Sequence, residues 1–324
     1  YDGVRNPSLH AKLMAREWDL LILDEAHKVK DVGAKQTQAV LGTAKVPGLA
    51  ARADRIVALT GTPLPNRPNE CFALVRILNH DAIDRMSPKQ FKEYYDISMK
   101  AKNGHEFQTT GHLHELQARL RAHVMVRRAK SAVLQDLPDK RYELAYVEST
   151  TAIRKVLEAE RLLDIDPDDL ENIPFELEGH IARVRKEMGI AKAPLVVEHL
   201  NNLFDGGTEK VVCFVYHTEV VRLLEEAFPG AAVVSGKTPM AAREAEKTRF
   251  QTDRRCKLFL GQLTAAGTGI DGLQNVCSHA VFAEASWTPG ENEQCGDRIH
   301  RYGQARGVLL QFLVAAGSLD ERIL

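Results

Sequence analysis

Residues 20–27 read Leu-Leu-Ile-Leu-Asp-Glu-Ala-His, so four apolar residues lead directly into two carboxylates and a histidine. An apolar run of this kind predicts a strand that is buried on both faces of a parallel sheet. Asp24 and Glu25 then fall at the carboxyl end of the strand, where open α/β sheets bind their ligands. Adjacent acids there suit a nucleotide-bound Mg²⁺, because one carboxylate can hold the metal while its neighbour orients or deprotonates water. The alternative is a strand that ends in a solvated acidic turn.

The bulk properties of the chain set the class of protein. A length of 324 residues predicts about two domains, and 44% hydrophobic with 27% charged residues is ordinary for a globular protein. The formal net charge of -1 gives no argument for nucleic acid or membrane, so a nucleic-acid site has to be a local patch. No apolar run reaches the length of a membrane span. The five dispersed cysteines favour reduced thiols in an intracellular protein over disulfides or zinc.

A second apolar run, RIVALTG at 55–61, ends in small hydroxyl residues and a glycine. Thr60, Gly61 and Thr62 suit phosphate or metal contacts, or a plain turn. Residues 69–126 then show a helical pattern, in which four apolar side chains are spaced for one face of a helix. These four are Leu113, Leu116, Leu120 and Val124.

The second half of the chain alternates apolar runs with helical segments. This alternation predicts a parallel sheet covered by helices, and hence an α/β fold. The runs lie at 211–217, 231–236, 257–263, 279–285 and 308–315. Between 151 and 188 the chain is charged and helical, with an acidic stretch at 164–169 that predicts a solvated loop.

Two glycine-containing stretches imitate nucleotide-binding motifs. Gly267, Gly269 and Gly272 have the letters of the dinucleotide fingerprint, but the next strand begins near His279 and leaves no room for the helix that would receive a pyrophosphate. Residues 235–238 read Ser-Gly-Lys-Thr, but the glycine that a P-loop requires five positions before its Gly-Lys is absent.

A polar constellation near the end of the chain consists of Gln294, Arg298, His300, Arg301, Gly303 and Gln304. Gln294 and Arg298 are four residues apart and Arg298 and Arg301 three apart, so a helix would place all three on one side. Two arginines on one helix can stabilise charge on a transferring phosphoryl group. The alternative is an exposed basic helix.

Taken in order, five motifs resemble the Swi/Snf-type ATPases of helicase superfamily two. They are DEAH at 24–27, LTGTPLPN at 59–66, VRRAKSAVLQDLP at 126–138, AAGTGIDG at 265–272 and WTPGENEQCGDRIHRYGQ at 287–304. FAEASWTPG, DRIHRYGQ and FLVAAGSLDE look closest to the annealing-helicase branch. The resemblance implies two RecA-like lobes with ATP and Mg²⁺ between them. It also implies double-stranded or forked DNA across both lobes, with DNA-bound proteins as further partners.

For the nucleotide site, the resemblance implies roles for individual residues. Asp24 and Glu25 match the Mg²⁺ and water-activating acids, and His27 matches the residue that links this site to the next motif. The motif that couples hydrolysis to lobe motion is matched by Thr60, Gly61 and Thr62. Arg298 and Arg301 match the arginine fingers, with Gln294 beside them.

For DNA, the resemblance points to other segments. Gly236, Lys237 and Thr238 match a contact to the DNA backbone, while Arg127 and Arg128 match paired arginines near the lobe connection. The loop near both DNA and nucleotide is matched by Gly267, Thr268, Gly269 and Asp271. The family more often has Asn where Asp271 stands.

The sequence therefore predicts an α/β protein in three parts. Residues 1–145 form the C-terminal part of a first RecA-like lobe with a helical insertion, 146–194 a helical connector, and 195–324 a second lobe. The family's P-loop and its adenine-reading glutamine are expected upstream of Tyr1, so either the chain is a piece of a longer protein or its first lobe is truncated by design. The predicted function is ATP-driven translocation on DNA that remodels protein–DNA complexes or reanneals strands. Two rivals remain: a DNA- or partner-binding module without hydrolysis, and an oxidoreductase built on the glycine-rich turn.

Overall fold

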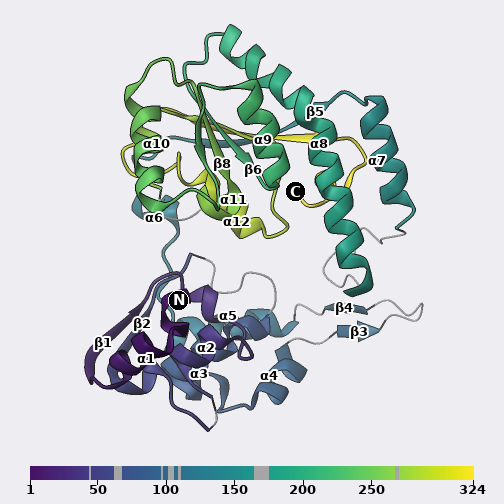
Figure 1. The fold of residues 1–324 in the computed structure, drawn as a ribbon. Coiled ribbons are helices and arrows are strands. Elements are labelled where there is room, and N and C mark those ends of the chain that lie inside the picture. The colour runs from purple at the N-terminus through teal and green to yellow at the C-terminus, as the bar shows by residue number, and fades with distance from the viewer. Residues whose placement is uncertain are drawn as a thin grey trace. The chain divides into compact units, whose positions relative to one another are not determined.

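The computed structural model describes residues 1–43, 45–61, 68–95, 98–100, 106–108, 111–163, 175–266 and 270–324. Contacts within the chain divide it into two compact units, Tyr1–Arg128 and Ala129–Leu324, and each is described by itself. Both units contain parallel strands with helices packed on them (Figure 1). The predicted α/β fold class is confirmed.

The first unit is built on two parallel strands, β1 (Trp18–Leu23) and β2 (Ala53–Ala58). Leu23 packs on one face with residues of α2 (Lys35–Leu41) and α3 (Phe72–Asn79). The other face is open, because Leu20 is 44% and Ile22 56% exposed. The prediction that this strand is buried on both faces is wrong for the described residues, since their helices cover one face of the pair.

The remainder of this unit is mainly helical and has its own core. Phe72, Phe91, Leu116 and Leu120 are buried together, as the helical spacing of the leucines predicted. The prediction of helices throughout 69–126 missed one antiparallel strand pair, β3 with β4. The elements are η1 (Asp2–Arg5), α1 (Pro7–Met14), η2 (Ala26–Val29), η3 (Leu49–Arg52), η4 (Pro68–Cys71), η5 (His80–Ile83), α4 (Pro88–Tyr95), β3 (Ser98–Lys100), β4 (Glu106–Gln108) and α5 (Gly111–His123).

The second unit has a six-stranded, wholly parallel sheet in the order β5-β10-β9-β6-β8-β7. Each apolar run predicted in the second half of the chain is one of its strands. Every residue of the central strand β6 is buried, as an uninterrupted apolar run predicts. The strands are β5 (Lys140–Val147), β6 (Val211–Val215), β7 (Ala232–Val234), β8 (Leu258–Gln262), β9 (His279–Phe282) and β10 (Val308–Ala315).

Helices cover both faces of this sheet and make a separate core on each. Val196 of α8 and Leu224 of α9 pack on one face, and Phe250 of α10 and Cys295 of α12 on the other. The helices are α6 (Lys130–Val133), α7 (Thr151–Arg161), α8 (Phe175–Asp205), α9 (Thr218–Ala227), α10 (Met240–Thr252), α11 (Leu263–Ala266), η7 (Leu273–Asn275), α12 (Pro289–Gly296) and α13 (Leu319–Arg322). Because η7 is a single 3-10 turn, no helix follows the glycine-rich stretch before β9, and this argues against the dinucleotide reading.

The three-part division of the chain stays a prediction, with two structural differences. β5 pairs along its length with β10, so residues 129–145 belong with the second unit, whereas the sequence division put them with the first. The helix α8 runs on through Pro194, where the sequence division ended the connector. The acidic stretch 164–169 lies outside the described residues.

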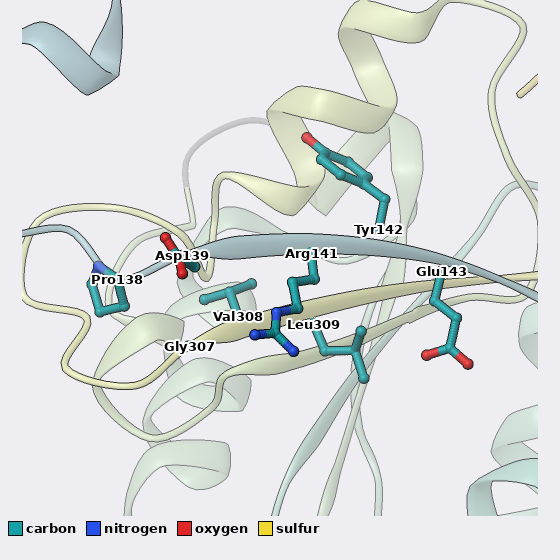
Figure 2. A pocket seen from close by; sticks show the side chains of 8 residues that line it. All are labelled: Pro138, Asp139, Arg141, Tyr142, Glu143, Gly307, Val308 and Leu309. Atoms are coloured by element: carbon teal, nitrogen blue, oxygen red, sulfur yellow. The ribbon is translucent and has the colours of Figure 1, made fainter.

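An open cavity of about 670 Å³ lies at the amino ends of β5 and β10. In Figure 2, Arg141 and Glu143 point to one side of β5 and Tyr142 to the other, as alternation along a strand requires. The lining includes none of the site residues predicted from the sequence. It consists of Pro138, Asp139, Arg141, Tyr142, Glu143, Gly307, Val308 and Leu309.

Candidate functional site

The acidic pair lies where the sequence predicted it, immediately after β1. Asp24 is exposed, and its Oδ1 accepts the amide of Glu25 at 3.0 Å. Glu25 has φ 49° and ψ 49°, a left-handed conformation that is uncommon for a residue with a side chain and recurs at functional sites. The Tyr1 hydroxyl donates to the Asp24 carbonyl at 2.6 Å. Burial, followed by the charges of Asp24 and Glu25, raises the pKa of Tyr1 to about 12.

His27 connects the acidic pair to the end of the neighbouring strand. Its Nδ1 lies 3.1 Å from the Thr60 hydroxyl and 3.4 Å from a carboxylate oxygen of Glu25. The backbone reinforces this junction, since the Ala26 amide donates to the Leu59 carbonyl at 2.9 Å. The structure thus brings together four residues that the sequence assigned to two motifs: Asp24, Glu25, His27 and Thr60. Gly61 follows Thr60 and is exposed, while Thr62 lies outside the described residues.

The donors at this strand end fit a hard divalent cation. Carboxylate oxygens are the ligands that Mg²⁺ prefers, and it commonly takes one or two of them together with water and substrate phosphates. Asp24 and Glu25 supply that number. Among the described residues there is no group of three or more His, Cys, Asp or Glu side chains able to hold a metal by themselves.

In the second unit the two predicted finger arginines contact one short loop. An Arg298 Nη donates to the Ile270 carbonyl at 3.0 Å, and an Arg301 Nη lies 3.1 Å from Asp271 Oδ1. The same Asp271 oxygen accepts the Gly272 amide at 2.7 Å. The structure therefore brings the two arginines next to the loop of Asp271, which the sequence assigned to a separate motif. Three further predicted members of this loop lie outside the described residues: Gly267, Thr268 and Gly269.

The prediction that Gln294, Arg298 and Arg301 share one helix is wrong. Helix α12 ends at Gly296, and Asp297 caps it. Beyond this point the Arg298 amide bonds to the Cys295 carbonyl three residues back, so the arginines stand on turns. Gln294 is inside the helix and partly buried.

Buried polar side chains explain why the chain leaves the helix here. His300 Nε2 donates to the Pro138 carbonyl at 2.8 Å. The side-chain Nε2 of Gln304 donates to the carbonyls of Cys277 at 2.8 Å and Ile299 at 2.9 Å. Burial lowers the pKa of His300, which fits a neutral ring that donates through Nε2. Both residues therefore hold the turn in place. The sequence alone grouped them with the arginines without separating these roles.

The loop at 236–238 follows β7 and uses its own amides. The Gly236 amide donates to Gln262 Oε1 at 2.9 Å, the Lys237 amide to the Ser235 hydroxyl at 3.3 Å, and the Thr238 amide to the Ser235 carbonyl at 3.0 Å. The Thr238 hydroxyl accepts the Ser235 amide at 3.0 Å, so a phosphate contact from this loop would rest chiefly on the exposed Lys237 side chain, with the Thr238 hydroxyl as a further donor. The backbone amides are already engaged.

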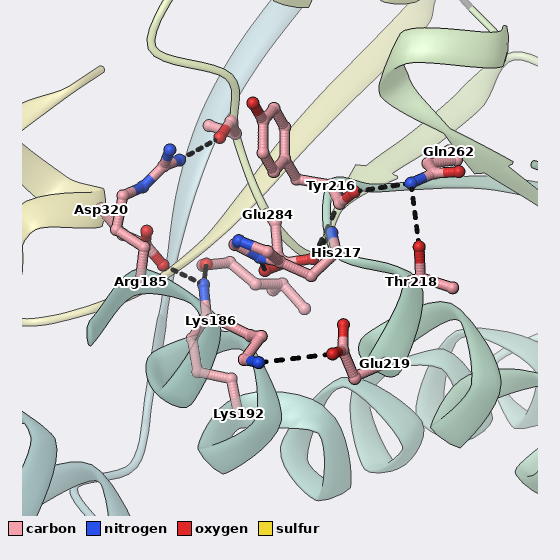
Figure 3. Close-up of polar contacts among 12 residues, drawn as sticks. Arg185, Lys186, Lys192, Tyr216, His217, Thr218, Glu219, Gln262, Glu284 and Asp320 are labelled. Atoms are coloured by element: carbon pink, nitrogen blue, oxygen red, sulfur yellow. Dashed lines mark hydrogen bonds and ion pairs between the residues drawn. The ribbon is translucent and has the colours of Figure 1, made fainter. Parts of the chain in front are cut away.

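Two residues that the sequence did not single out support this loop. Arg243 Nε donates to the Thr238 carbonyl at 2.9 Å, and one of its Nη atoms reaches the Ala265 carbonyl at 3.4 Å. Gln262 also donates to the Tyr216 carbonyl at 3.0 Å, and Figure 3 shows it bridging the ends of neighbouring strands. The contacts of Gln262 and Arg243 depend on the tertiary fold, so no spacing in the sequence predicts them.

Arg127 and Arg128 are both exposed, on the non-helical segment between α5 and α6. They are the last two residues of the first unit. Side chains in this position are accessible to a polyanion, which agrees with the resemblance without assigning them a contact.

A buried polar cluster lies behind the strand ends of the second unit (Figure 3). Glu284 accepts the amides of Tyr216 and His217, both at 2.9 Å, and its other oxygen lies 2.6 Å from His217 Nδ1. Lys192 of α8 is fully buried and pairs with Asp320. These partners satisfy the buried charges and hold α8 against the sheet.

Comparisons with known proteins identify the family of the chain. Residues 1–192 match the SNF2-related domain, and residues 195–303 match the helicase conserved C-terminal domain. A Caenorhabditis elegans protein, named SWI/SNF-related matrix-associated actin-dependent regulator of chromatin subfamily A-like protein 1 homolog, is 31% identical over 96% of this chain and 44% of its own length. The human DNA annealing helicase and endonuclease ZRANB3 is 27% identical over 94% of this chain and 28% of its own length. The chain thus spans less than half the length of these curated relatives.

Among solved structures, the Sulfolobus solfataricus SWI2/SNF2 ATPase core in complex with dsDNA is 20% identical, with a TM-score of 0.44. The match covers 99% of this chain and 68% of that one. In the part of the chain that the structure describes, no helix is both long and apolar enough to cross a membrane. Because the SNF2-related domain matches more than half of its length, the chain belongs to the SNF2-related family of helicase-like ATPases.

Proposed function

We propose that this chain works in an ATP-driven motor that translocates on double-stranded DNA and thereby remodels protein–DNA complexes or reanneals strands. The observation that carries the proposal is the 3.1 Å contact between His27 and Thr60. It joins the acidic pair at the end of β1 to the motif at the end of β2. A motor needs such a physical link, since the state of the nucleotide has to reach the groups that move.

In this proposal each residue has a task set by its chemistry. Asp24 and Glu25 would hold the Mg²⁺ that accompanies ATP, and this ion would supply positive charge beside the phosphates. The Glu25 carboxylate orients or deprotonates the attacking water. Arg301 leaves Asp271 to reach the transferring phosphoryl group, and Arg298 supports it.

The DNA contacts belong to other surfaces. The Lys237 ammonium and the Thr238 hydroxyl are suited to backbone phosphates, which carry no sequence information. Arg127 and Arg128 add charge beside the boundary between the units. A DNA substrate implies a nucleoid location in a prokaryote or virus and a nuclear one in a eukaryote.

Hydrolysis also needs a cradle for the phosphates. Residues 1–324 contain no Gly-x-x-x-x-Gly-Lys-Ser/Thr sequence, whose backbone amides and lysine normally provide it. We therefore expect the 324-residue chain to show no appreciable ATP turnover by itself. Steady hydrolysis by the 324-residue chain that Glu25→Gln abolishes would mean that the phosphate site is misplaced.

The deciding experiment measures ATP hydrolysis by the full-length protein with and without double-stranded DNA. We expect stimulation by DNA, and loss of turnover in Glu25→Gln with DNA binding retained. Glu17→Gln is the matched control, because Glu17 is an exposed acid just before β1 that pairs with Arg52 at 2.7 Å. A rate that does not respond to DNA would contradict the proposal.

The second candidate function is a module that binds DNA or a partner protein without hydrolysis. The absence of the phosphate-binding sequence from residues 1–324 favours it. It predicts DNA binding that is unaffected by ATP or by Glu25→Gln. Binding without any ATP turnover in the full-length protein would select this alternative.

A further inference from the structure

We infer that Lys130 and Asp297 form a positioning contact that ties the segment carrying both finger arginines to the segment that joins the two units. The arginine segment is residues 297–301, and the joining segment is residues 129–140, which open the second unit and end at the first residue of β5. Neither Lys130 nor Asp297 is a catalytic residue, because each acts through the arginines. The inference rests on the proposed ATPase function and names a control point for it.

Lys130 makes two contacts to the arginine segment. Its Nζ lies 2.7 Å from Asp297 Oδ2 and donates to the His300 carbonyl at 2.8 Å. The side chains of Lys130 and Asp297 are 35% and 33% exposed. The Lys130 ammonium therefore contacts both ends of the turn that contains Arg298, at Asp297 and at His300.

Two more residues of the joining segment, Lys140 and Pro138, contact the same turn. Lys140 Nζ lies 3.2 Å from the other oxygen of Asp297 and also pairs with Glu293 on α12. Burial opposes the charge on Lys140, but its bonds to Glu293 and Tyr142 and the charge of Asp297 outweigh this and raise its pKa above the ordinary value. The Asp297 carboxylate is thus bracketed by two ammonium groups.

The third contact is the bond from His300 Nε2 to the Pro138 carbonyl at 2.8 Å. It comes from a buried side chain, whereas Lys130 and Asp297 are partly exposed. The joining segment therefore meets the turn at Lys130, Pro138 and Lys140. Together these contacts leave little freedom for the backbone on either side of Arg298.

On its other side the arginine segment contacts the loop at 270–272. Arg298 bonds to the Ile270 carbonyl and Arg301 pairs with Asp271. Asp297 directly precedes Arg298, so a displacement of Asp297 moves the guanidinium that follows it. A misplacement of about 1 Å can cost roughly 100-fold in rate when a group acts on a transition state.

The position of Lys130 in the chain gives this contact its significance. Lys130 lies two residues after Arg128, the last residue of the first unit, and it begins α6. The joining segment thus directly follows the first unit in the chain. Through the Lys130–Asp297 contact, a shift of this segment would reach Arg298 and Arg301, so the placement of the finger arginines depends on the joining segment.

The test compares Lys130→Ala and Lys130→Arg in the full-length protein. For Lys130→Ala we expect kcat of the DNA-stimulated ATPase to fall by about 10- to 100-fold, with KM for ATP and DNA affinity within a few fold. Lys130→Arg should keep most of the rate, because its fork can reach both the Asp297 carboxylate and the His300 carbonyl. Arg222→Ala is the control, since Arg222 forms an exposed pair with Glu226 on α9 and should leave kcat unchanged.

A second readout does not depend on catalysis. Hydrogen exchange of the 324-residue chain should show faster exchange of the Ile299 and His300 amides in Lys130→Ala, and wild-type exchange in Lys130→Arg. Both amides bond to the Gly296 carbonyl, at 3.1 and 3.2 Å, so they report the turn itself. If the full-length protein hydrolyses no ATP at all, the proposed function fails. Hydrogen exchange alone then tests whether Lys130 holds the turn at 297–300.

Several outcomes would overturn the inference. One is unchanged exchange in Lys130→Ala, and another is a wild-type kcat in that variant. A change confined to KM would do the same, because it would place Lys130 in binding and not in positioning. Equal loss of rate in Lys130→Arg and Lys130→Ala would show that the charge contact has no part in the effect.

Discussion

An Arg301 Nη lies 3.1 Å from Asp271 Oδ1, so the predicted finger is engaged by a carboxylate of its own unit. The two side chains are 37% and 65% exposed. A pair this exposed contributes at most about 1 kcal/mol. A contact of that strength holds the guanidinium in place without preventing its transfer to a phosphate.

Asp271→Asn should therefore lower the KM for ATP by about two- to fivefold, because Arg301 no longer has to leave an anion. The asparagine oxygen can still accept the Gly272 amide, so the loop should keep its shape. The effect should disappear near 0.5 M salt, where exposed pairs are screened (~4 Å Debye length). Steady-state ATPase assays of the full-length protein at low and high salt check this. An unchanged KM at low salt would show that the ion pair does not compete with the nucleotide.

Arg301→Ala and Arg301→Lys should both abolish ATPase activity in the full-length protein. Loss of an arginine finger typically costs about 10³–10⁵ in rate, and lysine lacks the planar fork of donors. DNA affinity should stay within a few fold. Arg306→Ala, a nearby exposed arginine, is the control. Turnover, DNA affinity and melting temperature have to be measured together. A near-wild-type rate for Arg301→Lys would remove the finger assignment.

Lys237→Ala should weaken DNA binding about equally for all duplex sequences. The slope of log affinity against log salt should become shallower by about one, as expected for the loss of one phosphate contact. Lys155→Ala tests a matched lysine that is equally exposed on α7. Fluorescence anisotropy over a salt series gives both slopes. Identical slopes for Lys237→Ala and wild type would exclude Lys237 as a phosphate contact.

Glu160 on α7 should make the fold less stable as the pH rises. Burial raises its pKa from 4.5 to about 7, with the charge of Asp320 adding to this and the bond from the Leu319 amide opposing it. Between these two values the folded chain binds more protons than the unfolded chain, so stability falls with increasing pH and stays lower above pH 7. The penalty amounts to at most roughly 3 kcal/mol.

Glu160→Gln removes this titration and keeps an acceptor for the Leu319 amide. We expect it to raise the melting temperature more at pH 8 than at pH 4.5. Glu158→Gln, an exposed acid on the same helix, should show no such difference. Equal shifts for Glu160→Gln at both pH values would mean that folding does not raise the pKa of Glu160.

Asp320→Ala should be strongly destabilising, because it leaves the fully buried Lys192 ammonium without its counter-charge. Breaking a buried pair from one side costs about 3–5 kcal/mol, whereas replacing both partners by apolar groups is often close to neutral. The double variant Lys192→Met with Asp320→Ala should therefore recover most of the loss. Urea denaturation of the double variant and of the two single variants, Lys192→Met and Asp320→Ala, gives the three losses in stability. A loss in the double variant equal to the sum of the two single losses would contradict the interaction.

Features that depend on local periodicity could be predicted from the sequence. The uninterrupted apolar runs form parallel strands. Asp24 and Thr60 follow two neighbouring strands, and they lie at the same edge of the sheet because the carboxyl ends of parallel strands share one edge. The open face of β1 could not be predicted, since burial depends on which elements cover a strand. The end of α12 at Gly296 was also missed, because the buried bonds of His300 and Gln304 come from distant parts of the chain. The contacts of Lys130 could not be predicted either, because its partners Asp297 and His300 are far away in the sequence.

The end of α12 restricts how this protein can be engineered. Replacing a helix glycine by alanine usually gains up to about 1 kcal/mol of helix propensity, and stabilisation schemes often include that exchange. At Gly296 a Cβ would stand 2.6 Å from Leu310 Cδ1 on β10. Either the buried Leu310 side chain or the helix would have to shift, and a shift of the helix would carry Asp297 and the arginines with it. The close packing of helix α12 on β10 thus depends on the missing methyl group of Gly296, and the position of the arginine segment that follows depends on that packing.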